Sequence, residues 1–137
     1  NRGLEMSQWH GDLDKRKPTG GKGRRYRGKR AFEMGSPPAE TSLGKPVVKI
    51  ERVRGGGKKV RLQSCNYANV TDPDTKKTSK VEITRVVRNP ANIDYDRRGV
   101  ITKGTIIETP VGQAKVTSKP GQNGAVNALL VRKPSAE

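Results

Sequence analysis

The chain has 137 residues, with 29 Lys and Arg against 13 Asp and Glu and a formal net charge of +16. This length predicts one domain with an appendage, and the charge predicts a polyanionic partner, of which nucleic acid is the usual one. The single cysteine, Cys65, excludes an internal disulfide and a Cys-x-x-Cys metal site. No apolar run approaches the ~20 residues of a membrane span, so we expect no membrane partner.

Residues 1–46 are predicted to form an extended basic arm, because all nineteen Val and Ile residues lie between Val47 and Val131. Within the arm, residues 15–30 form a basic run that holds nine Lys or Arg and no acidic residue. Such a segment repels itself and needs a dense polyanion to neutralise it. A short helical turn is predicted around 40–43.

The basic run is the strongest candidate for binding nucleic-acid phosphates. Three of its four glycines, Gly20, Gly21 and Gly23, let the backbone approach a nucleic acid closely. Tyr26 has two interpretations: its ring stacks on a base or ribose, or it packs the arm against a barrel domain that we predict below for residues 47–137. For Phe32 the packing interpretation is favoured. The predicted phosphate-binding cations are Lys15, Arg16, Lys17, Lys22, Arg24, Arg25, Arg27, Lys29 and Arg30.

From Val47 onward the sequence is typical of short strands, rich in β-branched residues and separated by polar turns. A glycine turn at 55–57 predicts a hairpin, and a loop is expected from Asn89 to Gly99. This pattern predicts an all-β domain over 47–137, a small antiparallel β-barrel or sandwich of six to seven short strands. The strands are expected at 47–54, 58–64, 67–70, 81–87, 105–109, 113–118 and 125–132.

Two further cationic groups lie within this domain. The predicted hairpin carries Arg52, Arg54, Lys58, Lys59 and Arg61, and all of these except Lys58 share parity, which predicts one positive face with Glu51 on the other. The alternative to a nucleic-acid-binding face is that these residues form an ordinary solvated face of the sheet. The second group lies in glycine-containing loops and turns, whose backbone N–H groups can approach a phosphate, although plain turns explain them too. Its members are Arg97, Arg98, Lys103 and Lys119.

Catalytic chemistry has little support in this sequence. The one histidine, His10, offers no partner for an acid–base pair or a metal cluster. The paired aspartates of Asp72-Pro73-Asp74 are typical of a turn. We therefore expect no catalytic residue, no metal, no cofactor and no small-molecule substrate.

Several stretches in a fixed order together resemble a known family. They are Lys-Arg-Lys-Pro-Thr-Gly-Gly (15–21), Lys-Arg-Ala-Phe-Glu-Met-Gly (29–35), Pro-Ala-Glu-Thr (38–41), Val-Arg-Gly-Gly (53–56), Asn-Pro-Ala-Asn (89–92), Val-Ile-Thr-Lys-Gly (100–104), Ile-Glu-Thr (107–109) and Ala-Lys-Val-Thr-Ser-Lys-Pro-Gly-Gln-Asn-Gly-Ala-Val-Asn-Ala (114–128). This set closely resembles the small-subunit ribosomal protein family "S-eight-e" of archaea and eukaryotes. The resemblance extends from about Gln8 to Val131, and the short middle region looks like the archaeal form.

The resemblance implies a β-barrel with a basic N-terminal extension, bound to small-subunit rRNA beside neighbouring ribosomal proteins in the cytoplasm. It implies a structural constituent of the small (30S) subunit that stabilises 16S rRNA through the arm and the positive barrel loops. A DNA-compacting chromatin protein is the alternative, because it shares the charge.

Overall fold

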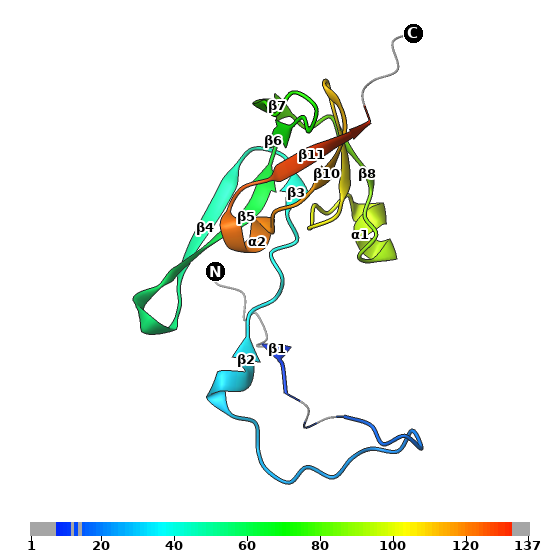
Figure 1. The fold of residues 1–137 in the computed structure, drawn as a ribbon. Coiled ribbons are helices and arrows are strands. Elements are labelled where there is room, and N and C mark those ends of the chain that lie inside the picture. The colour runs from blue at the N-terminus through cyan, green and yellow to red at the C-terminus, as the bar shows by residue number, and fades with distance from the viewer. Residues whose placement is uncertain (1–7, 12, 14, 133–137) are drawn as a thin grey trace. The chain divides into compact units, whose positions relative to one another are not determined.

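The fold comes from a computed structural model, which describes residues 8–11, 13 and 15–132 (Figure 1). The chain divides into two compact units, an N-terminal unit of Asn1–Pro38 and a C-terminal unit of Ala39–Glu137. Residues 39–46, which the sequence pattern grouped with the arm, belong to the second unit. Among the described residues no helix is long and apolar enough to cross a membrane.

In the N-terminal unit, two short strands close the two ends of the arm on each other. β1 (Gln8–Trp9) pairs antiparallel with β2 (Met34–Gly35), and a 3-10 turn at Ala31–Glu33 leads into β2. The His10 N–H extends the pairing by donating to the Glu33 carbonyl oxygen at 2.9 Å. The arm therefore contains a closed loop, which its composition does not predict.

The C-terminal unit contains a six-stranded sheet that curls into a half-barrel (Figure 1). Its strand order is β7-β6-β11-β10-β9-β8. All neighbours are antiparallel except β6 and β11, which are parallel. The predicted all-β barrel is therefore confirmed, with one parallel pair in this sheet. The strands are β6 (Tyr67–Thr71), β7 (Thr78–Glu82), β8 (Arg85–Arg88), β9 (Ile106–Thr109), β10 (Gly112–Val116) and β11 (Asn127–Arg132).

The prediction of a single strand at 81–87 is wrong, because these residues belong to two different strands, which lie at opposite edges of the sheet. β7 ends at Glu82 and β8 begins at Arg85. The Ile83 N–H donates to the Asn66 carbonyl oxygen at 2.8 Å, and the Thr84 N–H donates to that of Glu108 at 2.9 Å. Two residues thus connect the two edges, and this short connection curls the sheet.

A second sheet has three strands in the order β3-β5-β4. They are β3 (Ser42–Leu43), β4 (Val47–Arg52) and β5 (Lys58–Cys65). The helical turn predicted around 40–43 is wrong, because β3 lies parallel to β5. Thr41 explains the difference: its side chain is buried and its hydroxyl donates to the Leu62 carbonyl oxygen at 2.7 Å.

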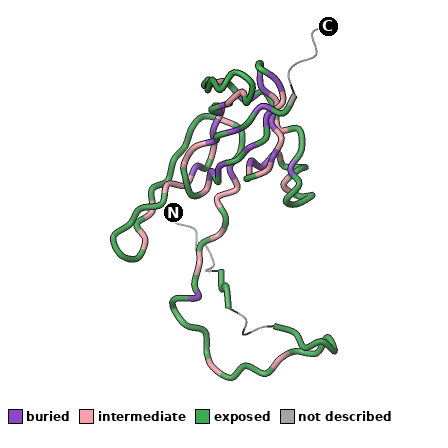
Figure 2. Tube along the Cα trace, viewed as in Figure 1, coloured by how far each residue is buried: buried purple, intermediate pink, exposed green. Residues whose placement is uncertain are grey.

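The hydrophobic core lies between the two sheets, within the C-terminal unit (Figure 2). Ile107 and Ala114 are fully buried, at 0% exposure. Cys65 is also buried, as expected for a small apolar residue. The other buried members are Leu62, Ala68, Val70, Ile83, Ile101, Val116, Val126, Ala128 and Leu130.

Two short helices stand where the sequence predicts a loop and a turn. α1 (Ile93–Arg98) begins at Asn92, whose side chain accepts a hydrogen bond from the Asp94 N–H at 3.0 Å. It ends at Gly99, whose φ of 64° is the left-handed conformation of a helix C-cap. α2 (Pro120–Asn123) is a single turn with Pro at its first position.

Candidate nucleic-acid interface

The first part of the basic run forms a tight hairpin loop. Arg16 and Lys22 face each other as an antiparallel bridge. Between them, the Lys17 N–H donates to the Gly21 carbonyl oxygen and the Gly20 N–H to that of Lys17, both at 2.9 Å. Gly20 has a φ of 83°, which favours glycine. These backbone bonds hold the loop together with one side-chain bond, which the Arg16 guanidinium donates to the Gly20 carbonyl oxygen at 2.9 Å.

This loop gathers a group of predicted phosphate-binding cations on one local scaffold. Lys15, Arg16, Lys17 and Lys22 are all exposed on it. At its base, a Cβ on Gly23 would lie 2.8 Å from the Lys15 carbonyl oxygen, so only glycine lets the two backbones approach this closely. The exposed Lys15, Lys17 and Lys22 stand on an ordered backbone, while the Arg16 guanidinium donates to the Gly20 carbonyl oxygen, and this arrangement suits a phosphate-binding loop.

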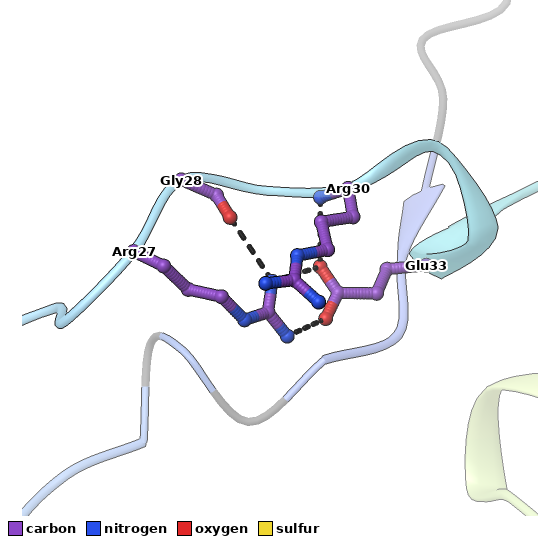
Figure 3. A network of polar contacts seen from close by, with 4 residues as sticks. All are labelled: Arg27, Gly28, Arg30 and Glu33. Atoms are coloured by element: carbon purple, nitrogen blue, oxygen red, sulfur yellow. Dashed lines mark hydrogen bonds and ion pairs between the residues drawn. The ribbon is translucent and has the colours of Figure 1, made fainter.

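The second part of the basic run is anchored by one carboxylate, which Figure 3 shows. The Glu33 side chain is buried, and it accepts hydrogen bonds from the Arg27 guanidinium and from the Arg30 N–H at 3.0 Å. Arg27 also donates to the Gly28 carbonyl oxygen at 3.0 Å. These bonds lower the pKa of Glu33 to about 2, with the Arg27 contact as the larger cause, and they raise the pKa of Arg27.

The aromatic residues of the N-terminal unit stand beside cations. Tyr26 is 85% exposed, and the Arg27 guanidinium carbon lies 5.6 Å from its ring centroid. The Lys29 Nζ lies 5.2 Å from the Trp9 ring. Arg24, Arg25 and Arg30 are exposed as well. An exposed ring among cations can stack on a base while its neighbours meet the phosphates.

The β4–β5 hairpin presents its cations on two faces, so the prediction of one positive face is wrong. A five-residue connection, 53–57, places Arg52 opposite Lys58 and Glu51 opposite Lys59. Directly paired residues of an antiparallel ladder share a face. Lys59 and Arg61 therefore lie with Glu51, whereas Arg52 lies on the opposite face with Lys58.

The face that carries Glu51 has mixed charge. The Glu51 carboxylate pairs with Arg61 and with Lys49, whose Nζ lies 3.1 Å from Oε1. These two contacts, the one with Arg61 first, lower the pKa of Glu51. At the tip of the hairpin, Arg52, Arg54 and Lys58 are exposed. This tip is the more positive part of the hairpin.

The last group of predicted cations is spread over the C-terminal unit. Arg97 and Arg98 lie on α1, which Figure 1 shows at a different end of the unit from the hairpin tip. Arg98 pairs with Asp94 and Glu40, which raises its pKa, chiefly through Glu40. Lys103 is exposed in a turn, and Lys119 precedes α2. These four cations therefore come from three segments of the chain: α1, the turn at Lys103 and the residue before α2.

Sequence reasoning missed two features of this surface. Glu33 is the one acidic residue between 15 and 39, a signal for a structural role inside the basic run. No sequence pattern marks Tyr67 and Lys80 as neighbours, yet the Lys80 Nζ lies 4.7 Å from the Tyr67 ring centroid. Only the β6–β7 register brings these two together. Across the described part of the chain, no three His, Cys, Asp or Glu residues are placed to hold a metal ion.

Comparison with known proteins gives consistent matches over almost the whole chain. The family model for Ribosomal protein S8e matches residues 10–131. Small ribosomal subunit protein eS8 of Sulfolobus acidocaldarius is 52% identical over 128 residues, which cover 93% of this chain and 99% of that protein. The protein of the same name from Methanococcus aeolicus is 54% identical over 127 residues, covering 92% and 98%. That from Hyperthermus butylicus is 51% identical over 132 residues, covering 95% and 96%.

Proposed function

Because this chain belongs to the ribosomal protein S8e family, we propose that it is a structural, non-enzymatic constituent of the archaeal small (30S) ribosomal subunit. In this role it acts in the cytoplasm, within the ribosome, and binds and stabilises 16S rRNA beside neighbouring ribosomal proteins. The family match over residues 10–131 is the observation that carries the proposal.

The geometry supports a phosphate contact from each of the two units. The hairpin loop of the basic run presents Lys15, Arg16, Lys17 and Lys22 on ordered backbone, which suits phosphates at close range. The tip of the β4–β5 hairpin, with Arg52, Arg54 and Lys58, supplies a second phosphate contact. Recognition is mainly of RNA shape, because the deep groove of A-form RNA hides its base edges from side chains.

Sedimentation of a cell lysate on sucrose gradients at low and moderate salt tests this function, with the protein detected by antibody. We expect the chain in the small-subunit fractions at both salt concentrations. Sedimentation at the top of the gradient, or with chromosomal DNA, would refute the proposal, and the second result would favour the chromatin alternative. Nuclease treatment of parallel samples separates the two polymers, since RNase and not DNase is expected to release the protein.

A further inference from the structure

A groove opens beside the base of the β4–β5 hairpin, and none of the cations predicted to bind RNA lines it. Its volume is about 350 Å³, within the range of ligand pockets. Apolar side chains of Val48, Leu62 and Val126 line it from three different parts of the C-terminal unit. Val48 is 49% exposed, whereas Leu62 and Val126 are each 2% exposed, so Val48 is the one of these three side chains that the protein leaves uncovered.

The polar side of the groove is built by two neighbouring strands. Tyr67 and Asn69 on β6 and Lys80 on β7 all line it. Asn69 is directly opposite Lys80 in the ladder, and residues two apart on a strand share a face, so all three lie on one face. The Tyr67 ring is 41% exposed, with the Lys80 Nζ 4.7 Å from its centroid.

Asn69 is held in a defined orientation by a second amide. Its Nδ2 donates to the Asn127 Oδ1 at 2.9 Å, across the parallel β6–β11 pair. An anchored amide on the same strand face as an aromatic ring offers hydrogen-bond donor and acceptor groups to the edge of a base. The groove therefore combines a ring, an ammonium group and an oriented amide.

We propose that this groove receives one unstacked base of the bound RNA. The Lys80 ammonium, which lies over the Tyr67 ring in the free chain, turns to the phosphate of this nucleotide; the base then stacks on the ring, and Asn69 hydrogen-bonds its edge. This inference rests on the proposed function and assigns to it a base-binding site outside the basic run. Aromatic stacking with edge hydrogen bonds is the usual way in which proteins read splayed-out RNA bases.

Charge favours an RNA base over a protein segment in this groove. Among the residues that line it, Lys80 is the charged one and none is acidic. The chain as a whole carries +16, which favours a polyanionic ligand over a neutral one. An apolar wall alone would suit either occupant, but a cation stacked on the lining ring suits a phosphate-bearing one.

The test uses the full chain and purified small-subunit rRNA, with affinity measured by filter binding over a range of salt concentrations. Tyr67→Leu, which keeps apolar bulk without a π face, is expected to weaken binding about 5- to 150-fold, the range for loss of one stacked base. Tyr67→Phe is expected to bind as the wild type does. Tyr67→Phe is therefore the matched control, because it changes the same position and keeps the π face.

The salt dependence separates the base contact from the phosphate contact. Tyr67→Leu should leave the slope of log affinity against log salt unchanged, because a base contact releases no counterions. Lys80→Gln should reduce the slope by about 0.7 to 0.9. Wild-type affinity in Tyr67→Leu would overturn the base site while the proposed function stands, leaving the groove to a protein neighbour. Failure of the wild-type chain to bind the rRNA would overturn both.

Discussion

Removing two charges from the hairpin loop of the basic run should change the salt dependence of rRNA binding by a predictable amount. The variant is Lys15→Gln with Lys17→Gln. Both side chains are exposed, and the loop is held by backbone hydrogen bonds, such as that from the Lys17 N–H to the Gly21 carbonyl oxygen. The substitutions therefore remove charge and leave the loop intact.

The magnitude follows from counterion release. Each phosphate contact contributes about 0.7 to 0.9 to the slope of log affinity against log salt. Two lost contacts lower the slope by about 1.4 to 1.8. Between 50 and 200 mM salt, the affinity of the variant should therefore fall by a factor roughly ten times smaller than that of the wild type. If the wild-type chain contacts six to ten phosphates, its affinity should fall about a thousandfold or more over the same interval.

Filter binding of small-subunit rRNA at several salt concentrations measures both slopes. The matched control is Lys76→Gln with Lys77→Gln, which removes the same charge from an exposed turn outside the predicted interface. We expect the control to change the slope by less than half as much. Equal slopes for the two double variants would show that only the total charge matters, and would refute the assignment of phosphate binding to the hairpin loop.

Three further predictions concern the scaffold. Arg27 and the Arg30 N–H hold the pKa of Glu33 at about 2, below its usual 4.5, so its stabilisation of the N-terminal unit is complete above about pH 4.5 and is lost as pH falls toward 2. Trp9 fluorescence should report this acid transition, and the transition should be absent in Glu33→Gln. Gly124→Ala should destabilise the C-terminal unit by more than about 1 kcal/mol in urea, because Gly124 has a φ of 70° and a Cβ there would overlap Val60. Gly55→Ala is the control, because Gly55 has a φ of 79° but no atom within 4 Å of an added Cβ, so its loss of unfolding free energy measures the cost of the backbone conformation alone. Equal losses of unfolding free energy in the two variants would argue against the overlap. Ile107→Ala should cost about 2 to 5 kcal/mol in the same assay, and a loss below about 1 kcal/mol would contradict its place in the core.

The strands of the C-terminal unit could be predicted because their signal is local. Alternation in 58–64 and β-branched residues in 47–54 were sufficient to predict β5 and β4 to within two residues. The small helix α1 was missed although Asn92 and Gly99 are typical caps, because the six residues between them, four of which are charged, also suit a loop.

What could not be predicted depends on contacts between distant residues. The pairing of β1 with β2 joins residues 8–9 to 34–35, and no local pattern marks it. The faces of the β4–β5 hairpin depend on which residues stand opposite across the connection, and parity counted along each strand does not contain that register. The groove at Tyr67 and Lys80 has the same origin, since β6–β7 pairing alone brings them together.

The ion pairs divide the predicted RNA-binding cations into two kinds. Arg27 is paired with a carboxylate that is only 7% exposed, so releasing it to a phosphate would leave Glu33 buried without a partner. The Arg98 side chain is 46% exposed and those of its partners Asp94 and Glu40 are 55% and 33% exposed, so these pairs contribute little and can be exchanged for a phosphate. We therefore expect Arg27 to order the arm and Arg98 to bind rRNA. The conformational entropy of the arm is then lost when the chain folds and not when it binds RNA. More of the free energy of each phosphate contact therefore contributes to affinity.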